Sequence, residues 1–157
     1  MKKNQQECGG KEARVVLCLG SNIEPRRAYL DRAQAALCAL PATRFSSASE
    51  TEETEPVGVP PEFAHLRFLN QLAVFETELE VHEFSRRMHA VEDALGRTRT
   101  VRNGPRTIDL DLVDFDGLAV DEPDLVLPHP RARERAFVME PWRRLRREAA
   151  DGDAESR

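Results

Sequence analysis

The chain has 157 residues and a formal net charge of −5, with 40% hydrophobic and 32% charged residues, which is typical of one globular domain. The mildly acidic mean argues against nucleic-acid binding, and no apolar run approaches the ~20 residues that a membrane span requires. All lysines precede Glu12 (Lys2, Lys3 and Lys11), which excludes a P-loop or Schiff-base lysine from the rest of the chain.

The ends of the chain are polar. We expect an N-terminal extension over residues 1–12, a single domain over 13–147 and a polar tail over 148–157. The N-terminus lacks the apolar segment of a signal peptide, so we expect a cytoplasmic protein. Three cysteines without metal-ligand spacing fit a reducing compartment: Cys8, Cys18 and Cys38.

The first half of the chain predicts a strand, a helix and a weaker strand. The apolar run 14–19 indicates a buried strand, and Gly20-Ser21-Asn22 is typical of a turn that caps a helix. Apolar residues spaced by three or four predict an amphipathic helix over 25–40. Residues 43–51 indicate the second strand, and the proline-rich segment 54–61 a stiff loop.

The second half repeats the order of strand, helix and strand. Alternation over 68–77 predicts a strand, and apolar spacing predicts a helix over 81–95 that Gly96 ends. An arginine-rich loop over 97–106 leads into a strand over 107–115. A short strand at 118–120 and a short helix from about residue 131 follow.

Two β-α-β units predict an α+β fold. We expect a ferredoxin-like βαβ-βαβ sandwich, with a mostly antiparallel sheet and helices packed on its faces.

The charges are arranged in blocks along the second half of the chain. Residues 97–106 carry +4, residues 107–124 carry −7 and residues 125–147 carry +5. Such alternation suggests a site where metal and phosphate are held side by side.

Asp109 and Asp111 are the strongest candidates for metal ligands. On a strand, residues i and i+2 point to the same face roughly 6.6–6.8 Å apart, so both carboxylates can reach one divalent ion or bridge two. Carboxylate oxygens suit Mg²⁺, which keeps waters and phosphate oxygens as further ligands. The alternative is a solvated strand face with two acids that bind nothing.

The neighbouring arginines favour phosphate binding. Arginine pairs bidentately with phosphate and keeps its charge, so the 97–106 loop could clamp a phosphate group. The alternative is a solvated basic loop that contacts an acidic partner. His129, held between two prolines, is a further phosphate donor or a turn residue at the surface.

Phe68 and Asn70 lie on one face of the predicted strand. An aromatic ring and an amide suit a planar heterocycle, because the ring stacks while the amide donates and accepts hydrogen bonds. The alternative is a core phenylalanine beside an edge asparagine.

Taken together, these motifs resemble the 6-hydroxymethyl-7,8-dihydropterin pyrophosphokinase family over about residues 14–142. In chain order they are Leu19-Gly20-Ser21-Asn22, Thr54-x-Pro56-x-Gly58, Phe68-Leu69-Asn70, Glu92-x-x-Leu95-Gly96-Arg97-x-Arg99, Gly104-Pro105-Arg106-Thr107-Ile108-Asp109-Leu110-Asp111, Pro128-His129-Pro130-Arg131 and Arg135-Ala136-Phe137-Val138.

The resemblance implies transfer of the β,γ-pyrophosphoryl group of ATP to the hydroxymethyl of a reduced pterin, giving AMP and the pterin diphosphate in folate biosynthesis. It implies two Mg²⁺ ions on Asp109 and Asp111, with Arg97 and Arg106 stabilising the transferring charge. It places six residues at the ATP: His89, Glu92, Arg99, Leu112, His129 and Arg135. It places seven around the pterin: Gly20, Thr54, Pro56, Val57, Phe68, Asn70 and Phe137.

The loop before Gly104 departs from the family pattern. Members commonly carry a large aromatic where Asn103 stands, and the loop is about one residue shorter than in some relatives. This concerns how the loop closes the site, not which reaction occurs.

Two other functions stay open from the residues alone: a Mg²⁺-dependent nucleotidyltransferase and a non-catalytic ferredoxin-like module that binds a protein partner. For the pyrophosphokinase we expect a monomer whose partners are ATP and the pterin, with no membrane and no nucleic acid.

Overall fold

The computed structural model describes residues 11–56, 59–96, 105–131 and 135–155. Its main sheet holds β1 (Ala13–Ser21), β2 (Thr43–Ala48), β4 (Phe68–Thr77) and β5 (Asp109–Phe115) in the order β2-β4-β1-β5, and the short β3 (Glu52–Thr54) pairs with β4. All of these pairings are antiparallel. With α2 (Arg26–Cys38) between β1 and β2 and α3 (Val81–Ala94) between β4 and β5, the expected ferredoxin-like α+β fold is confirmed.

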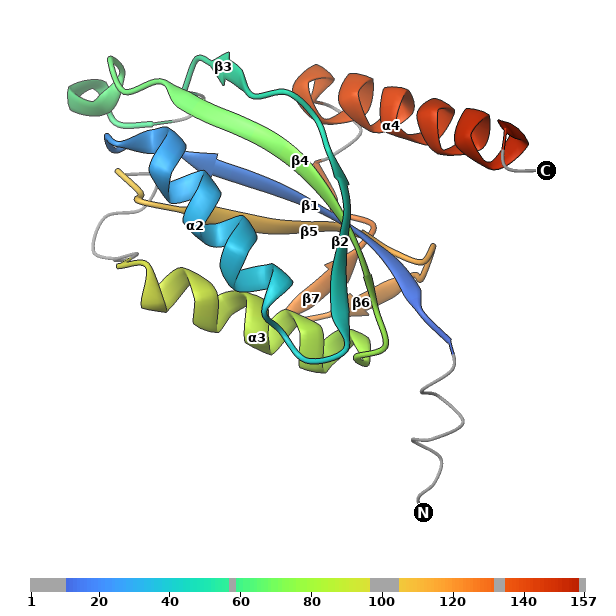
Figure 1. The fold of residues 1–157 in the computed structure, drawn as a ribbon. Coiled ribbons are helices and arrows are strands. Elements are labelled where there is room, and N and C mark those ends of the chain that lie inside the picture. Colours follow the sequence, from blue (N-terminus) through green and yellow to red (C-terminus); the bar gives the residue numbers. More distant parts are fainter. Residues whose placement is uncertain (1–10, 57–58, 97–104, 132–134, 156–157) are drawn as a thin grey trace.

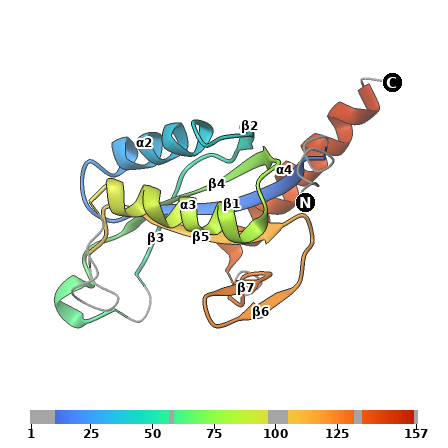
Figure 2. The ribbon, with the colours of Figure 1, turned by 90° about the horizontal axis from the view of Figure 1, so that it is seen from below.

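The two faces of the sheet are covered differently. Helices α2 and α3 lie on one face, and α4 (Ala136–Glu155) packs on the other (Figures 1 and 2). The larger core lies under α2 and α3, where Leu17, Phe75 and Phe84 are fully buried. On the opposite face, Val138 and Leu145 of α4 join a smaller apolar cluster.

The predicted periodic elements are confirmed, and only the two helices have shifted ends. The helices expected over 25–40 and 81–95 are α2 and α3, and the strand over 68–77 is β4. Gly96 follows α3 with a φ of +87°, the left-handed conformation in which glycine lacks the steric penalty of other residues.

Several short elements differ from the prediction. The structure adds β3, the 3-10 helix η1 (Pro61–Phe63) and a hairpin of β6 (Val120–Glu122) and β7 (Leu125–Leu127), where one strand at 118–120 was expected. The short helix expected from about residue 131 is wrong, because α4 starts at Ala136 and runs 20 residues to Glu155, into the expected tail. Among the described residues, no helix is long and apolar enough to cross a membrane.

The hairpin β6–β7 belongs to the helix side of the sheet, because Leu125 and Leu127 of β7 join the core under α2 and α3. Figure 2 shows this hairpin and the segment around η1 at opposite ends of the molecule.

Candidate active site

One row of residues crosses three strands at the end of the sheet. Gly20 of β1 pairs with Asn70 of β4 on one side and with Asp109 of β5 on the other. In the next row of the same face, Cys18 lies between Leu72 and Asp111. Since paired residues point to the same face of a sheet, the predicted pterin amide and both predicted metal carboxylates share one surface.

Gly20 leaves room for its neighbours. A Cβ atom at this position would lie 2.9 Å from Asn70 Oδ1 and 3.6 Å from Phe68 Cδ1. Any side chain here would therefore displace the amide of Asn70, which explains the glycine by close approach and not by backbone conformation.

The predicted pterin residues of β1, β3 and β4 come together. Asn70 Nδ2 donates to Thr54 Oγ1 at 2.6 Å, and Thr54 pairs with the partly exposed Phe68 in the β3–β4 ladder. Pro56, partly exposed, follows two residues after Thr54. Val57 and the side chain of Phe137 lie outside the described part of the chain.

The two aspartates are partly exposed, and each faces a basic side chain. Their side chains are 19% (Asp109) and 33% (Asp111) exposed. Arg106 Nη1 lies 2.9 Å from Asp109 Oδ2, and His129 Nε2 lies 3.8 Å from Asp111 Oδ1. Both carboxylates are therefore accessible to a ligand while their charges are balanced by the protein.

The backbone sets the orientation of His129. Its N–H donates to the carbonyl of Val113 at 3.0 Å, and the N–H of Arg131 donates to its Nδ1 at 3.2 Å. An accepting Nδ1 leaves the proton of the neutral ring on Nε2, the atom that faces Asp111. His129 is thus presented to the site as a donor, although it comes from the loop after β7.

Asp111 stays ionised in this environment. Burial by itself raises the pKa of its carboxyl, but the neighbouring His129, Arg135 and Arg106 outweigh burial and the net pKa is lowered. Beneath it, burial and the charges of Asp111 and Asp109 raise the pKa of the Cys18 thiol. Cys18 is therefore an uncharged packing residue and not a nucleophile, as its place in an apolar strand predicts.

The two carboxylates suit a divalent cation that takes most of its ligands from water and substrate. Two carboxylates offer hard oxygen atoms, and no group of three or more His, Cys, Asp or Glu side chains in the described chain could hold an ion by itself. Mg²⁺ fits such a site, because it commonly takes one or two carboxylates and fills its octahedron with water and substrate phosphates.

Asn22 was assigned the wrong role from the sequence. It does not cap α2, whose N-cap is Pro25 without a side-chain hydrogen bond. Its side chain is buried, Oδ1 accepts from the N–H of Arg106 at 2.6 Å, and its own N–H donates to the Arg106 carbonyl at 3.1 Å. These reciprocal bonds fix the backbone of Arg106, and the only sequence signal for them was the Gly20-Ser21-Asn22 motif.

Glu92 joins α3 to the first residues of β5. The side chain is fully buried, Oε2 accepts from the N–H of Leu110 at 2.7 Å, and Oε1 lies 3.0 Å from Nδ1 of the exposed His89. Leu110 lies between the two aspartates in sequence, so this bond fixes the strand that carries them.

The remaining predicted ATP residues lie on several elements. Leu112 points away from Asp111 into the core under α2 and α3. Arg135 precedes α4 and lies close enough to Asp111 to lower its pKa. Arg97 and Arg99 lie outside the described residues.

Comparison with known proteins gives a consistent result. The model of the family described as 7,8-dihydro-6-hydroxymethylpterin-pyrophosphokinase (HPPK) matches residues 16–147. The chain is 40% identical over 125 residues to the 2-amino-4-hydroxy-6-hydroxymethyldihydropteridine pyrophosphokinase of Bacillus subtilis, covering 80% of this chain and 73% of that protein. The proteins of the same name from Methylorubrum extorquens and Pseudomonas aeruginosa are 41% and 36% identical over 82% of this chain, and 79% and 77% of their own lengths are covered.

Proposed function

The chain belongs to the 7,8-dihydro-6-hydroxymethylpterin-pyrophosphokinase family, and from this premise we propose which of its residues perform the reaction. It is an ATP-dependent pyrophosphokinase that converts 6-hydroxymethyl-7,8-dihydropterin to its diphosphate in folate biosynthesis. Family membership decides against the nucleotidyltransferase and the non-catalytic module. The single observation that supports the residue assignment best is the row Asn70–Gly20–Asp109 across three adjacent strands.

The metal site of this proposal consists of Asp109 and Asp111, which would hold two Mg²⁺ ions. When bound, such ions neutralise phosphate charge and orient the group that is transferred. The two carboxylates are partly exposed on one face, and the lowered pKa of Asp111 keeps that group charged and ready to bind a cation.

Arg106 would stabilise the charge of the transferring group. Its guanidinium pairs with Asp109, and its backbone is fixed by Asn22, so the cation is held beside the predicted metal ligands. A guanidinium that is already in position needs little reorganisation when negative charge develops on the phosphate oxygens. Arg97 is assigned the same role from the family resemblance.

The pterin subsite would consist of Gly20, Thr54, Pro56, Val57, Phe68, Asn70 and Phe137. Because Asn70 Nδ2 donates to Thr54, its Oδ1 faces the space above Gly20 as an acceptor for pterin N–H groups. The rings of Phe68 and Phe137 would contact the flat faces of the pterin.

The ATP subsite would consist of His89, Glu92, Arg99, Leu112, His129 and Arg135. His129 would donate from Nε2 to a phosphate oxygen, as its tautomer allows. Because Glu92 is fully buried on the N–H of Leu110, it would act by holding β5, and its neighbour His89 would contact the nucleotide.

We also propose that the chain acts as a cytoplasmic monomer without nucleic acid. The acidic net charge of −5 supports the last point, since polyanion binding requires a cationic face.

The experiment that tests the residue assignment is incubation with ATP, Mg²⁺ and 6-hydroxymethyl-7,8-dihydropterin. The wild type should form AMP and pterin diphosphate in equal amounts, and release of pyrophosphate instead would contradict the reaction. Asp109→Ala and Asp111→Ala should each lose nearly all turnover at every Mg²⁺ concentration. Either variant retaining wild-type turnover would remove that carboxylate from the metal site.

A further inference from the structure

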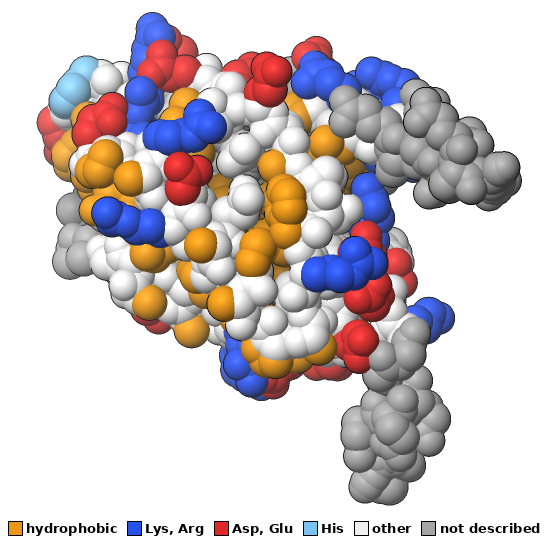
Figure 3. All heavy atoms as spheres, in the orientation of Figure 1, with side chains coloured by type: hydrophobic (Ala, Val, Ile, Leu, Met, Phe, Trp, Pro, Cys, Tyr) orange, Lys and Arg blue, Asp and Glu red, His pale blue; other side chains and the backbone are white. Residues whose placement is uncertain are grey.

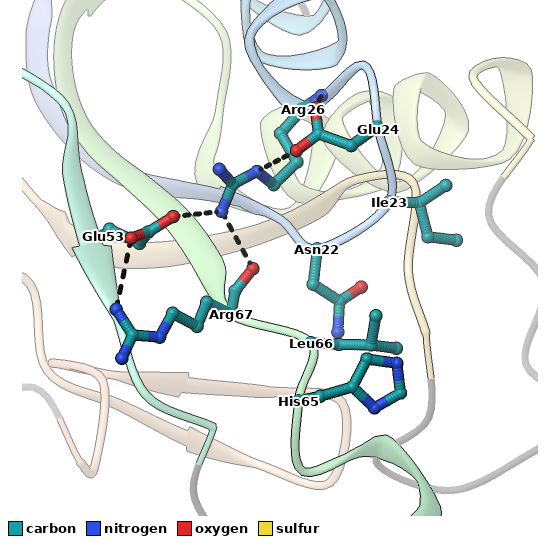
Figure 4. Close-up of a pocket in the computed structure, with 8 residues that line it drawn as sticks. All are labelled: Asn22, Ile23, Glu24, Arg26, Glu53, His65, Leu66 and Arg67. Carbon is teal, nitrogen blue, oxygen red and sulfur yellow. Dashed lines mark hydrogen bonds and ion pairs between the residues drawn. The ribbon is translucent and has the colours of Figure 1, made fainter.

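The side chain of Arg26, at the start of α2, joins three separate segments of the chain. Its Nη1 lies 2.9 Å from Glu53 Oε2 of β3 and donates to the carbonyl of Arg67 at 3.1 Å, while its Nε lies 2.9 Å from Glu24 Oε2 (Figure 4). Only 20% of the side chain is exposed, which is low for a charged group near the surface. The guanidinium therefore has a defined place between the loop before α2, β3 and the residue before β4.

Strand β3 has few other means of staying in place. It is three residues long, pairs with β4 alone in the described sheet, and contains no buried residue. A segment with so little buried apolar surface gains little from packing, so specific polar contacts decide its position.

Glu53 and Thr54 belong to the same short strand but face opposite sides of it. Successive residues of a strand alternate, so the Glu53 carboxylate points toward Arg26 while Thr54 Oγ1 receives the bond from Asn70. A displacement of Glu53 therefore carries Thr54 with it, because one peptide unit connects the two residues.

The space behind β3 is a pocket and not a packed core. The pocket has a volume of about 380 Å³ and is lined mainly by charged and polar residues, among them Asn22, Glu53, His65 and Arg67, together with Ile23 and Leu66 (Figure 4). Figure 3 shows acidic and basic side chains alternating over this corner of the molecule. Without the ion pair, this open space would allow β3 to shift, whereas a close-packed core would resist such a movement.

A second arginine reinforces the arrangement from outside. Arg67 Nη1 lies 3.4 Å from Glu53 Oε1, and its Nη2 lies 2.5 Å from Glu55 Oε2. The hydrogen bond from Arg26 lowers the pKa of Glu53 more than any other partner, so the pair stays charged throughout the neutral range.

We propose that Arg26 and Glu53 are positioning residues that set the place of Thr54 and thereby the affinity for the pterin, without touching it. The inference rests on the proposed pterin subsite. The ion pair should affect pterin binding alone, because it does not contact the metal carboxylates of β5.

The test is steady-state kinetics of Glu53→Gln with each substrate varied in turn. Removing this partly exposed ion pair should raise the pterin KM about fivefold. The turnover number and the ATP KM should stay within about twofold of wild type, because β5 is unaffected. An unchanged pterin KM, or equal changes in the KM values of both substrates, would overturn the inference.

Glu55→Gln is the matched control. It removes the same charge two residues along the chain and breaks only the bond to Arg67, so its pterin KM should stay near wild type. If it matched Glu53→Gln, the effect would be one of general charge and the inference would be wrong.

A double-mutant cycle gives the second measurement. If Arg26 acts through Glu53, the pterin KM of Arg26→Gln combined with Glu53→Gln should equal that of Arg26→Gln alone. Fully additive changes would overturn the pairing. Asn70→Ala tests the pterin subsite itself, and an unchanged pterin KM in that variant would refute the proposed subsite. Glu53→Gln tests only how that subsite is positioned.

Discussion

The two faces of the main sheet are built from the same strands but differ in what they bury. In β1, Val15, Leu17 and Leu19 face α2 and α3, whereas Cys18 and Gly20 face the candidate site. In β5, Leu110 and Leu112 lie in the core, whereas Asp109 and Asp111 lie on the site face. Strand alternation thus separates the residues that stabilise the fold from those proposed to carry the chemistry.

The coverage of the two faces explains this division. Helices α2 and α3 bury the first face along its length, which requires large apolar side chains. On the second face, α4 packs on an apolar group that includes Val16, Val74 and Val113, and the row at the end of β1 lies outside this apolar group. Mutations on the two faces should therefore have different consequences.

The largest effect is expected from Asp111→Asn on the site face. Losing one charged oxygen ligand should cost several kcal/mol of transition-state stabilisation, or about 10³-fold in kcat/KM, while the thermal midpoint changes little. Asp114→Asn on the same strand is the control, since Asp114 has no place in the proposed site. A comparable loss in both variants would show that charge along β5, and not metal ligation, is responsible.

Next in size is Phe84→Ala on the helix face. Phe84 is fully buried and packs edge-on against Phe115 with ring centroids 6.0 Å apart. The cavity should lower the free energy of unfolding by ~3–5 kcal/mol in urea denaturation, with kcat of the folded fraction near wild type. Leu118→Ala, at an exposed position, should change stability by less than ~0.5 kcal/mol. A large loss of kcat in folded Phe84→Ala would contradict the separation of the two faces.

A smaller effect is expected from Asn22→Ala, because Asn22 connects the end of β1 to Arg106. Removing the acceptor for the Arg106 N–H should lower kcat about tenfold, in line with ~1–3 kcal/mol for a donor left unpaired. Asn22→Asp keeps an acceptor oxygen and should recover most of the activity. Combined with Arg106→Ala, Asn22→Ala should add no further loss; full additivity would show that Asn22 acts elsewhere.

The smallest effect concerns His82, which lies on neither face and joins α3 to β6. Its ring lies 2.6 Å from Glu80 Oε2 and 2.9 Å from Glu122 Oε1, and hydrogen bonds to these carboxylates raise its pKa from 6.5 to about 8. Because the folded pKa is the higher one, the stabilisation is complete below about pH 6.5 and is lost as the pH rises through about 8. Thermal midpoints between these values should fall in the wild type and fall less in His82→Gln. If the thermal midpoints of the two proteins changed in parallel with pH, this contact would not be a cause of the pH dependence.

Long periodic segments could be predicted because each repeats its pattern several times. The apolar spacing of α2 and α3 and the alternation of β4 gave their positions to within two residues. Strands β3, β6 and β7 have three residues each, too few for alternation to be recognised, and β3 also depends on pairing with the more distant β4.

The roles of Asn22 and Glu92 show the limit of sequence patterns at the site. A serine-asparagine pair before a helix favours capping, yet Asn22 bonds to Arg106, 84 positions along the chain. Glu92 fits a motif of the family, but only its burial on the Leu110 N–H shows that it supports β5.

The sequence by itself determined the α+β class, the shared face of Asp109 and Asp111, and the family with its reaction. These follow from local periodicity and from motifs whose spacing is fixed along the chain. Only the tertiary structure decided that Asn70, Gly20 and Asp109 form one row, that Asn22 bonds to Arg106, and that Arg26 pairs with Glu53 of β3. Such contacts join residues far apart in sequence, and their geometry exists only once the strands have paired in register.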